Sequence, residues 1–217
     1  MDRLNRFERK HPGFGIPNLM IYIVASMLFI YIFDSAAAAS GRSLSQLLFF
    51  YWPLILEGQV WRIITFALLP PNTSLIFIIF ALYFSYMIGS ALENEWGTCT
   101  FTIYYFIGIL GSIAAGIITG AAYNTYLNLS LFFAFAILFP DFQIMLFFIL
   151  PIKVKYIAYL DAMYFIVSLI LGSWAERAAI LASLINLFIF FSGTFIKNLK
   201  RRGQYRRTRK NFRRQIR

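Results

Sequence analysis

Long uncharged stretches alternate with short charged or polar breaks along this chain. A helix needs about 20 apolar residues to cross a bilayer core about 30 Å thick. The polar sequence Tyr123-Asn124-Thr125 divides the longest uncharged stretch in two. The pattern predicts an all-α membrane protein whose membrane domain covers residues 18–196. The six expected transmembrane helices lie at residues 18–37, 74–92, 100–122, 126–139, 156–173 and 177–196.

Two segments between these helices are themselves partly apolar. The first external loop, residues 38–73, is long and holds the apolar run Leu47–Trp52. We expect it to lie partly in the membrane interface, where Trp and Arg side chains are well accommodated. The segment Phe142–Ile152 is too short to cross the membrane and contains Pro151, so we expect a buried or interfacial loop there.

Composition agrees with a membrane protein, since 60% of the 217 residues are hydrophobic and 13% are charged. Soluble domains are nearer half apolar. Seventeen of the 20 Lys and Arg residues lie in the N-terminal segment 1–17, the loop after the fourth helix or the tail 197–217. The positive-inside rule then predicts a multi-pass protein of the cell membrane with both termini in the cytoplasm. We expect no cleavable signal peptide, because the first apolar stretch is too long for a signal core.

The tail Lys197–Arg217 has eleven basic residues and no acidic one. Such a segment next to a transmembrane helix favours binding to anionic lipids of the bilayer. Nucleic acid is a less favoured partner, because only Tyr205 and Phe212 supply aromatic rings for base stacking.

Few residues in the chain are suited to metal or redox chemistry. Cys99 is the single cysteine, which rules out an intramolecular disulfide. The single histidine, His11, precedes the first helix, and no His, Cys and carboxylate residues cluster at metal-ligand spacing. We therefore expect neither a metal nor another cofactor.

Several short motifs follow one another in the order of a known family. Gly58–Phe66 reads G-Q-V-W-R-I-I-T-F, and Gly89, Leu92-Glu93 and Gly97 follow at suitable spacing. The later matching segments are Leu138–Pro140 and Phe147–Lys153. Together these motifs resemble those of the rhomboid intramembrane proteases over residues 50–195. The resemblance implies a six-helix, rhomboid-like bundle.

The same resemblance implies structural roles for the motif residues. Trp61 and Arg62 would anchor the first external loop. Glu93 would bond to backbone or to a neighbouring helix at the cytoplasmic side, beside Gly97.

The catalytic residues of that family do not match. Rhomboid proteases use a serine in a Gly-x-Ser-Gly motif of the fourth helix, a histidine in the sixth, and a His-x-x-x-Asn pair in the second. Here the second-helix pair falls near Phe77 and Ala81, and the sixth helix has no histidine. Ser130 is the candidate nucleophile if the chain is active, although counting back from Leu138–Pro140 favours Thr125.

A serine hydroxyl is a poor nucleophile without a neighbouring base. His11 is expected on the opposite membrane side, about 30 Å of hydrocarbon away. The sequence therefore predicts a pseudoprotease, a rhomboid-like protein without protease activity.

Three polar residues inside the expected helices are further candidates. Asp161 is a functional candidate by default, because an ionisable group within the membrane is costly. Its alternative is a structural residue near the cytoplasmic end, about one and a half turns past Lys155, that snorkels or is paired within the chain. Asn186, and Asn128 together with Ser130, are expected to hydrogen-bond across helices and to support packing.

Two other groups of residues have simple structural interpretations. The third helix carries a stripe of small residues that includes Gly116 and Gly120, for which we expect packing within the chain rather than dimerisation. The charged residues at the outer face are expected to be solvated at the interface. They are Asp34, Arg42, Glu57, Glu176 and Arg177.

Three functions fit these observations. The first is a non-catalytic rhomboid-like protein that binds or escorts transmembrane segments of other proteins. The second is a rhomboid-type serine protease with a divergent active site at Ser130. The third is a small transporter or lipid-handling protein, supported by Asp161 and by the polar segment Asn124–Asn128.

Overall fold

The structure is a computed structural model that describes residues 14–37, 43–71, 74–146 and 150–191. The predictions for His11, Arg42 and the basic tail concern residues outside these ranges. Five described helices are long and apolar enough to cross a membrane, which makes the chain a multi-pass, mainly helical membrane protein. They are α2 (Leu19–Ala37), α6 (Leu75–Trp96), α7 (Thr98–Thr119), α9 (Val154–Leu171) and the helix Trp174–Phe191.

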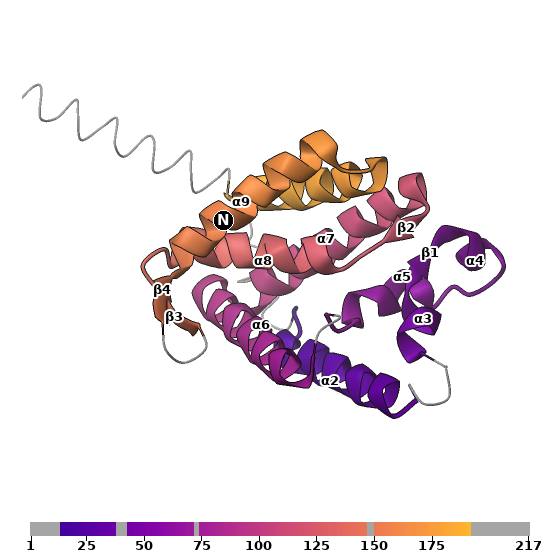
Figure 1. Cartoon of the computed structure of the whole chain (residues 1–217), viewed down its shortest axis with the longest axis horizontal. Helices are drawn as coiled ribbons and strands as arrows, with labels where there is room; N and C mark the ends of the chain where they lie inside the picture. Colours follow the sequence, from indigo (N-terminus) through magenta and orange to yellow (C-terminus); the bar gives the residue numbers. More distant parts are fainter. Residues whose placement is uncertain (1–13, 38–42, 72–73, 147–149, 192–217) are drawn as a thin grey trace, which may run out of the picture.

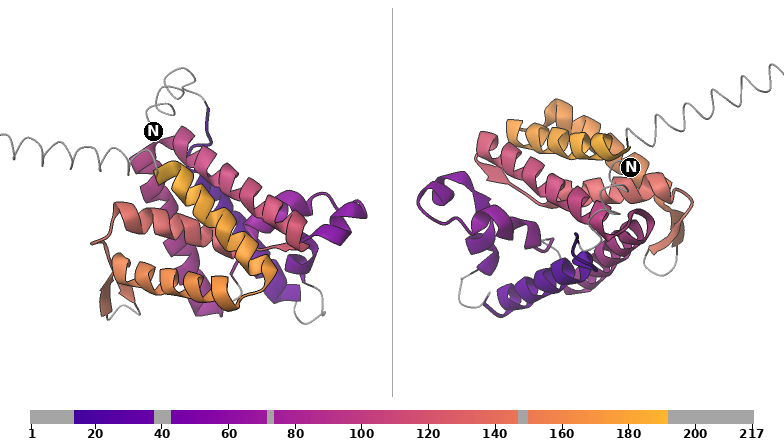
Figure 2. Two further views of the ribbon diagram at one scale, coloured as in Figure 1. Left: turned by 90° about the horizontal axis from the view of Figure 1, so that it is seen from above. Right: turned by 180° about the vertical axis from the view of Figure 1, so that it is seen from behind.

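The predicted fourth span corresponds to α8, Thr125–Leu138, which has 14 residues. At 1.5 Å per residue it is about 21 Å long, shorter than the bilayer core. Figures 1 and 2 show these helices as one bundle, with the helix Trp174–Phe191 lying along α7. The predicted boundaries are close to those observed, and α6 continues one turn beyond residue 92.

The reversal between α6 and α7 takes a single residue, Gly97, with φ at 85°. Glycine tolerates this conformation because it has no Cβ. The Glu93 carboxylate lies beside this turn, where its Oε1 accepts from the Asn18 N–H over 2.9 Å and from the Thr98 hydroxyl over 3.1 Å. The turn is thereby joined to the start of α2, which runs antiparallel to α6.

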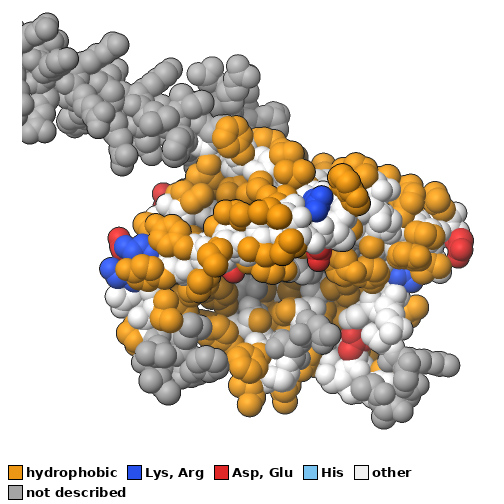
Figure 3. Space-filling model, turned by 45° about the horizontal axis from the view of Figure 1, so that its top comes forward, with side chains coloured by type: hydrophobic (Ala, Val, Ile, Leu, Met, Phe, Trp, Pro, Cys, Tyr) orange, Lys and Arg blue, Asp and Glu red, His pale blue; other side chains and the backbone are white. Residues whose placement is uncertain are grey.

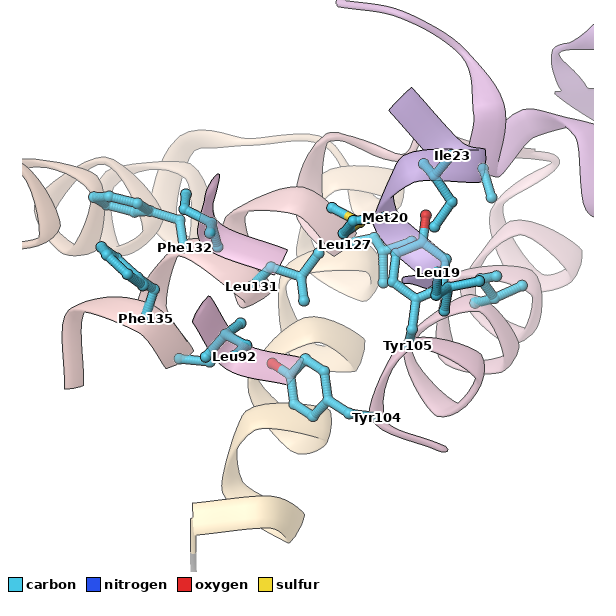
Figure 4. Packing of buried hydrophobic residues seen from close by; sticks show 14 of the residues in the cluster. Leu19, Met20, Ile23, Leu92, Tyr104, Tyr105, Leu127, Leu131, Phe132 and Phe135 are labelled. Carbon is cyan, nitrogen blue, oxygen red and sulfur yellow. The ribbon is translucent and has the colours of Figure 1, made fainter. Parts of the chain in front are cut away.

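The core forms where α2, α6, α7 and α8 meet. Figure 4 shows Met20 of α2 beside Leu127 of α8, with Tyr104 of α7 near Leu92 of α6. Tyr104, Leu92 and Leu127 are almost completely buried. Apolar burial and close packing hold these helices together within the chain.

The first loop folds into short helices and a strand. It contains α3 (Leu44–Leu48), β1 (Phe50–Tyr51), α4 (Trp52–Leu56), α5 (Arg62–Thr65) and the 3-10 helix η2 (Phe66–Leu68). Strand β1 pairs with β2, Ala121–Ala122, placing Phe50 opposite Ala122. Phe50 and Phe66 are fully buried and form an edge-to-face pair. The loop is therefore fastened to the end of α7.

Three of the charged residues predicted to be solvated at the outer face also have polar partners within the chain. The Asp34 carboxylate accepts from the backbone N–H groups of Leu44 and Ser45 and from the Ser45 hydroxyl, and so caps α3. Glu176 accepts from the Ser173 N–H, and Arg177 donates to the Ile170 carbonyl over 2.8 Å. These side chains are still partly exposed, and they bind here because unpaired backbone groups near helix ends attract nearby charged side chains.

At the other end of the bundle, the segment predicted as a loop is a β-hairpin. Strand β3 (Gln143–Leu146) pairs antiparallel with β4 (Leu150–Lys153), so that Gln143 lies opposite Lys153. Figure 1 shows this hairpin and the first-loop elements at opposite ends of the molecule. Pro151 fits here because this two-stranded sheet leaves the outer edge of β4 unpaired.

The small residues of α7 allow other parts of the chain to approach closely. A Cβ on Gly108 would meet Leu127 and Asn186, and one on Gly116 would lie 2.6 Å from a ring carbon of Phe50. The prediction of packing within the chain is confirmed at these positions. Figure 3 shows an outer surface rich in hydrophobic side chains, with few charged groups. Lipid contact accounts for such a surface.

Candidate binding cavity

A cavity of about 300 Å³ lies among α2, α6, α8 and α9. This volume is at the lower end of the range for small-molecule sites. Most of its wall is apolar, and its polar groups come chiefly from α8 and α9. The lining consists of Met20, Met27, Pro71, Ala81, Phe84, Ser85, Ile88, Asn124, Thr125, Asn128, Leu129, Leu131, Phe132, Ile157 and Asp161.

Helical spacing explains which side chains reach the cavity. Ala81, Ser85 and Ile88 of α6 are separated by four and three residues and therefore share one face. Ile157 and Asp161 are four residues apart on α9 and likewise share a face. The cavity is thus built from faces of regular helices.

The polar part of the lining is only partly satisfied by hydrogen bonds. Asn124 donates from Nδ2 to the Leu69 carbonyl over 2.6 Å, and the Ser85 hydroxyl donates to the Ala81 carbonyl over 2.8 Å. Among the described residues, the side chains of Thr125, Asn128 and Asp161 have no hydrogen-bond or ion-pair partner. Two of these three side chains are neutral and one can carry a negative charge.

Asp161 forms no ion pair within the described part of the chain. The Lys155 ammonium lies 2.8 Å from Asp141 Oδ1 instead, and Lys153 lies 3.3 Å from the same atom. Asp161 is half-buried and faces the cavity from within α9. It is the only ionisable group in the described lining.

Ser130 lies outside the cavity. Its side chain is 1% exposed, and its hydroxyl donates to the Leu127 carbonyl over 2.8 Å. Its own carbonyl accepts from the Tyr104 hydroxyl over 3.0 Å, which links α8 to α7. Thr125, the position favoured by counting back from the end of α8, does line the cavity.

The two positions that match the second-helix pair of the rhomboid proteases also differ in location. Ala81 lines the cavity opposite α8, whereas Phe77 is half exposed and is not part of the lining. The described lining contains no histidine, lysine or cysteine. A Ser–His or Ser–Lys pair therefore cannot be built from it.

Asn186 lies outside the cavity, in a tightly packed contact. Its Nδ2 donates to the Tyr104 carbonyl over 3.4 Å, so it joins the last helix to α7 as predicted. Asn128 makes no such bond across helices within the described chain, and for it the packing role was wrong. The three intramembrane polar candidates thus divide into a cavity pair, Asn128 with Asp161, and a packing residue.

Trp61 and Arg62 hold the first loop together. Arg62 Nη1 donates to the Gln46 and Phe49 carbonyls over 2.8 and 2.7 Å, and Nε donates to Gln59 Oε1 over 2.7 Å. Trp61 Nε1 donates to the Leu47 carbonyl over 3.2 Å. These contacts fit the anchoring role that the motif implied.

The sequence did not point to the contribution of α2. Met20 and Met27 are seven residues apart on a helix that is apolar all round. The packing of Met20 against Gly89 of α6 and the burial of Ile23 and Met27 show which face turns inward. No group of three His, Cys, Asp or Glu residues that could hold a metal occurs within the described ranges.

Comparison with protein-family models and with curated proteins found no match. The rhomboid resemblance therefore stays a prediction from the motifs.

Proposed function

We propose that this chain is a non-catalytic, rhomboid-like membrane protein that binds or escorts transmembrane segments of other proteins. The cavity is the observation that carries the proposal. It lies at the positions, Ala81 and Thr125, where the resemblance would put a protease active site. It offers hydroxyl, amide and carboxylate groups without a histidine or lysine base.

The chemistry of the cavity suits a helix better than a hydrolytic reaction. Transmembrane helices associate through close packing and through polar side chains that hydrogen-bond across the interface. Thr125 and Asn128 present such groups in a mainly apolar wall, and neither is used within the described chain. A helix presenting one polar side chain would satisfy them.

Site-specific photocrosslinking tests the proposal. A photoreactive phenylalanine analogue at Ile157, in the cavity, is compared with the same analogue at Ile166, whose side chain is 59% exposed on α9. The chain is co-expressed with a defined set of single-span membrane proteins. We expect adducts from position 157 and few from position 166, whereas equal adduct yields at both positions would refute the proposal.

We further propose that the chain lies in the cell membrane with both termini in the cytoplasm. Lys153 and Lys155 lie where α9 begins. The positive-inside rule puts such basic residues on the cytoplasmic side of the membrane, which supports this orientation. In a Cys99→Ser background, Glu57→Cys and Asp141→Cys are exposed to a membrane-impermeant maleimide. In intact cells we expect only the cysteine at position 57 to be labelled, and the reverse pattern overturns the orientation.

The tail Lys197–Arg217 is proposed to bind anionic lipid. Each basic residue near a charged membrane contributes about 1 kcal/mol. Vesicles containing phosphatidylglycerol should therefore retain the tail far better than phosphatidylcholine vesicles, and added salt should release it. Equal retention by both vesicles would argue against this partner.

The position of Asp161 also favours a second candidate function, in which the chain transports or handles a small molecule or lipid. Carboxylates facing intramembrane cavities occur along transport paths. In this case Asp161→Asn should alter uptake or lipid composition in cells that express the chain. Unchanged uptake and lipid composition, together with position-specific crosslinking from Ile157, would leave segment binding as the function.

A further inference from the structure

Asp161 has no cationic partner within the described chain. The described Lys and Arg residues are all engaged elsewhere. Arg62 binds the first loop, Lys153 and Lys155 pair with Asp141, and Arg177 donates to the Ile170 carbonyl. Neutral apolar side chains form most of the wall around the Asp161 carboxylate.

A carboxylate in such surroundings is costly to leave charged and unpaired. Transfer of an unpaired charge into an apolar medium is costly, and intramembrane ionisable groups are usually paired. Either a proton or a cation from outside the described chain can satisfy Asp161. A protonated carboxyl has one O–H donor, whereas an ammonium group has three N–H donors, so a cation can serve Asp161, Thr125 and Asn128 together.

Three features of the lining fit a lysine side chain. An ammonium group has three N–H donors and no acceptor. The Asp161 carboxylate, the Asn128 side-chain carbonyl and the Thr125 hydroxyl are all able to accept hydrogen bonds. Met20 and Phe84 belong to the apolar wall, which suits the four-carbon stem of lysine. A volume of about 300 Å³ also fits inserted side chains better than a whole helix.

We propose that Asp161 selects the segments that this cavity binds, favouring transmembrane helices with a lysine in their membrane-spanning part. The lysine enters the cavity and pairs with Asp161, while Thr125 and Asn128 accept its other N–H groups. This inference rests on the proposed function, since it specifies the class of segment that occupies the same cavity.

Binding of designed peptides to the full-length chain in phosphatidylcholine nanodiscs tests the inference. The probes are leucine–alanine helices of about 20 residues with lysine, leucine or glutamate at the central position. The lysine peptide should bind about tenfold tighter than the leucine peptide, the effect expected of one charge-assisted hydrogen bond. Asp161→Asn should abolish that difference by weakening the binding of the lysine peptide.

Two further variants control for folding and for general charge effects. Asp161→Lys should reverse the preference so that the glutamate peptide binds best, a gain that a misfolded protein would not give. Glu95→Gln removes an exposed carboxylate on α6 outside the cavity and should retain the lysine preference.

The outcomes separate the two proposals. Equal affinity of the wild-type chain for the lysine and leucine peptides overturns the role of Asp161 and leaves segment binding intact. A lysine preference that persists in Asp161→Asn also overturns it. Failure of all three peptides to bind overturns the proposed function, and this inference with it.

Discussion

Arg62 donates from Nη1 to the carbonyl oxygen of Phe49 over 2.7 Å, across 13 residues of the first loop. The Arg62 side chain is 3% exposed, so this charged group is held inside the protein by backbone carbonyls and by Gln59. Phe50, which directly follows Phe49, begins the strand that fastens the loop to α7. One buried cation therefore positions the loop relative to the helices.

Arg62→Ala should lower the free energy of unfolding by about 3 kcal/mol, because the Gln46 and Phe49 carbonyls lose a buried, charged donor. The matched control is Trp61→Phe, which removes a single hydrogen bond from a side chain that is 49% exposed. It should cost less than about 1 kcal/mol. Unfolding by denaturing detergent in mixed micelles measures both, and equal losses would contradict the anchoring role of Arg62.

Gly116→Ala should destabilise the protein by about 1 to 3 kcal/mol, the usual cost of overpacking. The added Cβ would lie 2.6 Å from Phe50 Cε1 and 2.8 Å from the Ala122 Cβ. Gly111→Ala on the same helix is the control, since its Cβ would meet Ala182 at an ordinary 3.6 Å. Thermal unfolding in detergent compares them, and a Gly116 variant as stable as the Gly111 variant would refute close packing there.

The helices were predictable from sequence because each needs a long apolar stretch. The end of α6 was harder to place. Glu93 and Glu95 end the apolar stretch, but they do not end the helix, which continues until Gly97 adopts a positive φ. The β3–β4 hairpin was missed because an apolar run of this length does not distinguish strand from irregular loop.

The candidate site was only partly predictable. Asp161 stood out as an intramembrane carboxylate. Counting back from the motif Leu138–Pro140 was the only argument that favoured Thr125 over Ser130. The contributions of Met20 and Met27 could not be predicted, because α2 has no polar face to mark its orientation. The Asp34 cap could not be predicted either, because its partners lie ten and eleven residues later in the chain.

The Asp141 carboxylate provides a pH-dependent contribution to stability. Hydrogen bonds from Lys155 and then Lys153 lower the pKa of Asp141 below its usual value of 3.8. A carboxyl group whose pKa is depressed by folding stabilises the protein above its unfolded pKa, and this contribution disappears as pH falls through the folded pKa. Asp141→Asn should therefore lower the thermal midpoint slightly at neutral pH and lose this effect well below pH 3.8.

The size of that effect is small because the pair is exposed to solvent. Added salt should reduce it further by screening. The control is Glu57→Gln, which removes an exposed carboxylate that has no ion pair within the described chain. A destabilisation by Asp141→Asn that persists unchanged far below pH 3.8 would show that the contribution is not electrostatic.

Fluorophosphonate probes should not label Ser130, because its hydroxyl is buried and donates to the Leu127 carbonyl. Such reagents require a serine that is both accessible and activated by a base. Ser130→Ala should accordingly leave the labelling of the purified protein unchanged and cost about 1 kcal/mol of stability, the value of one hydrogen bond. Thr125→Val serves as the parallel variant, since Thr125 is the hydroxyl that faces the cavity. Labelling that Ser130→Ala abolishes would revive the serine protease, whereas labelling abolished by Thr125→Val alone would place a hydrolytic nucleophile in the cavity and refute a non-catalytic function.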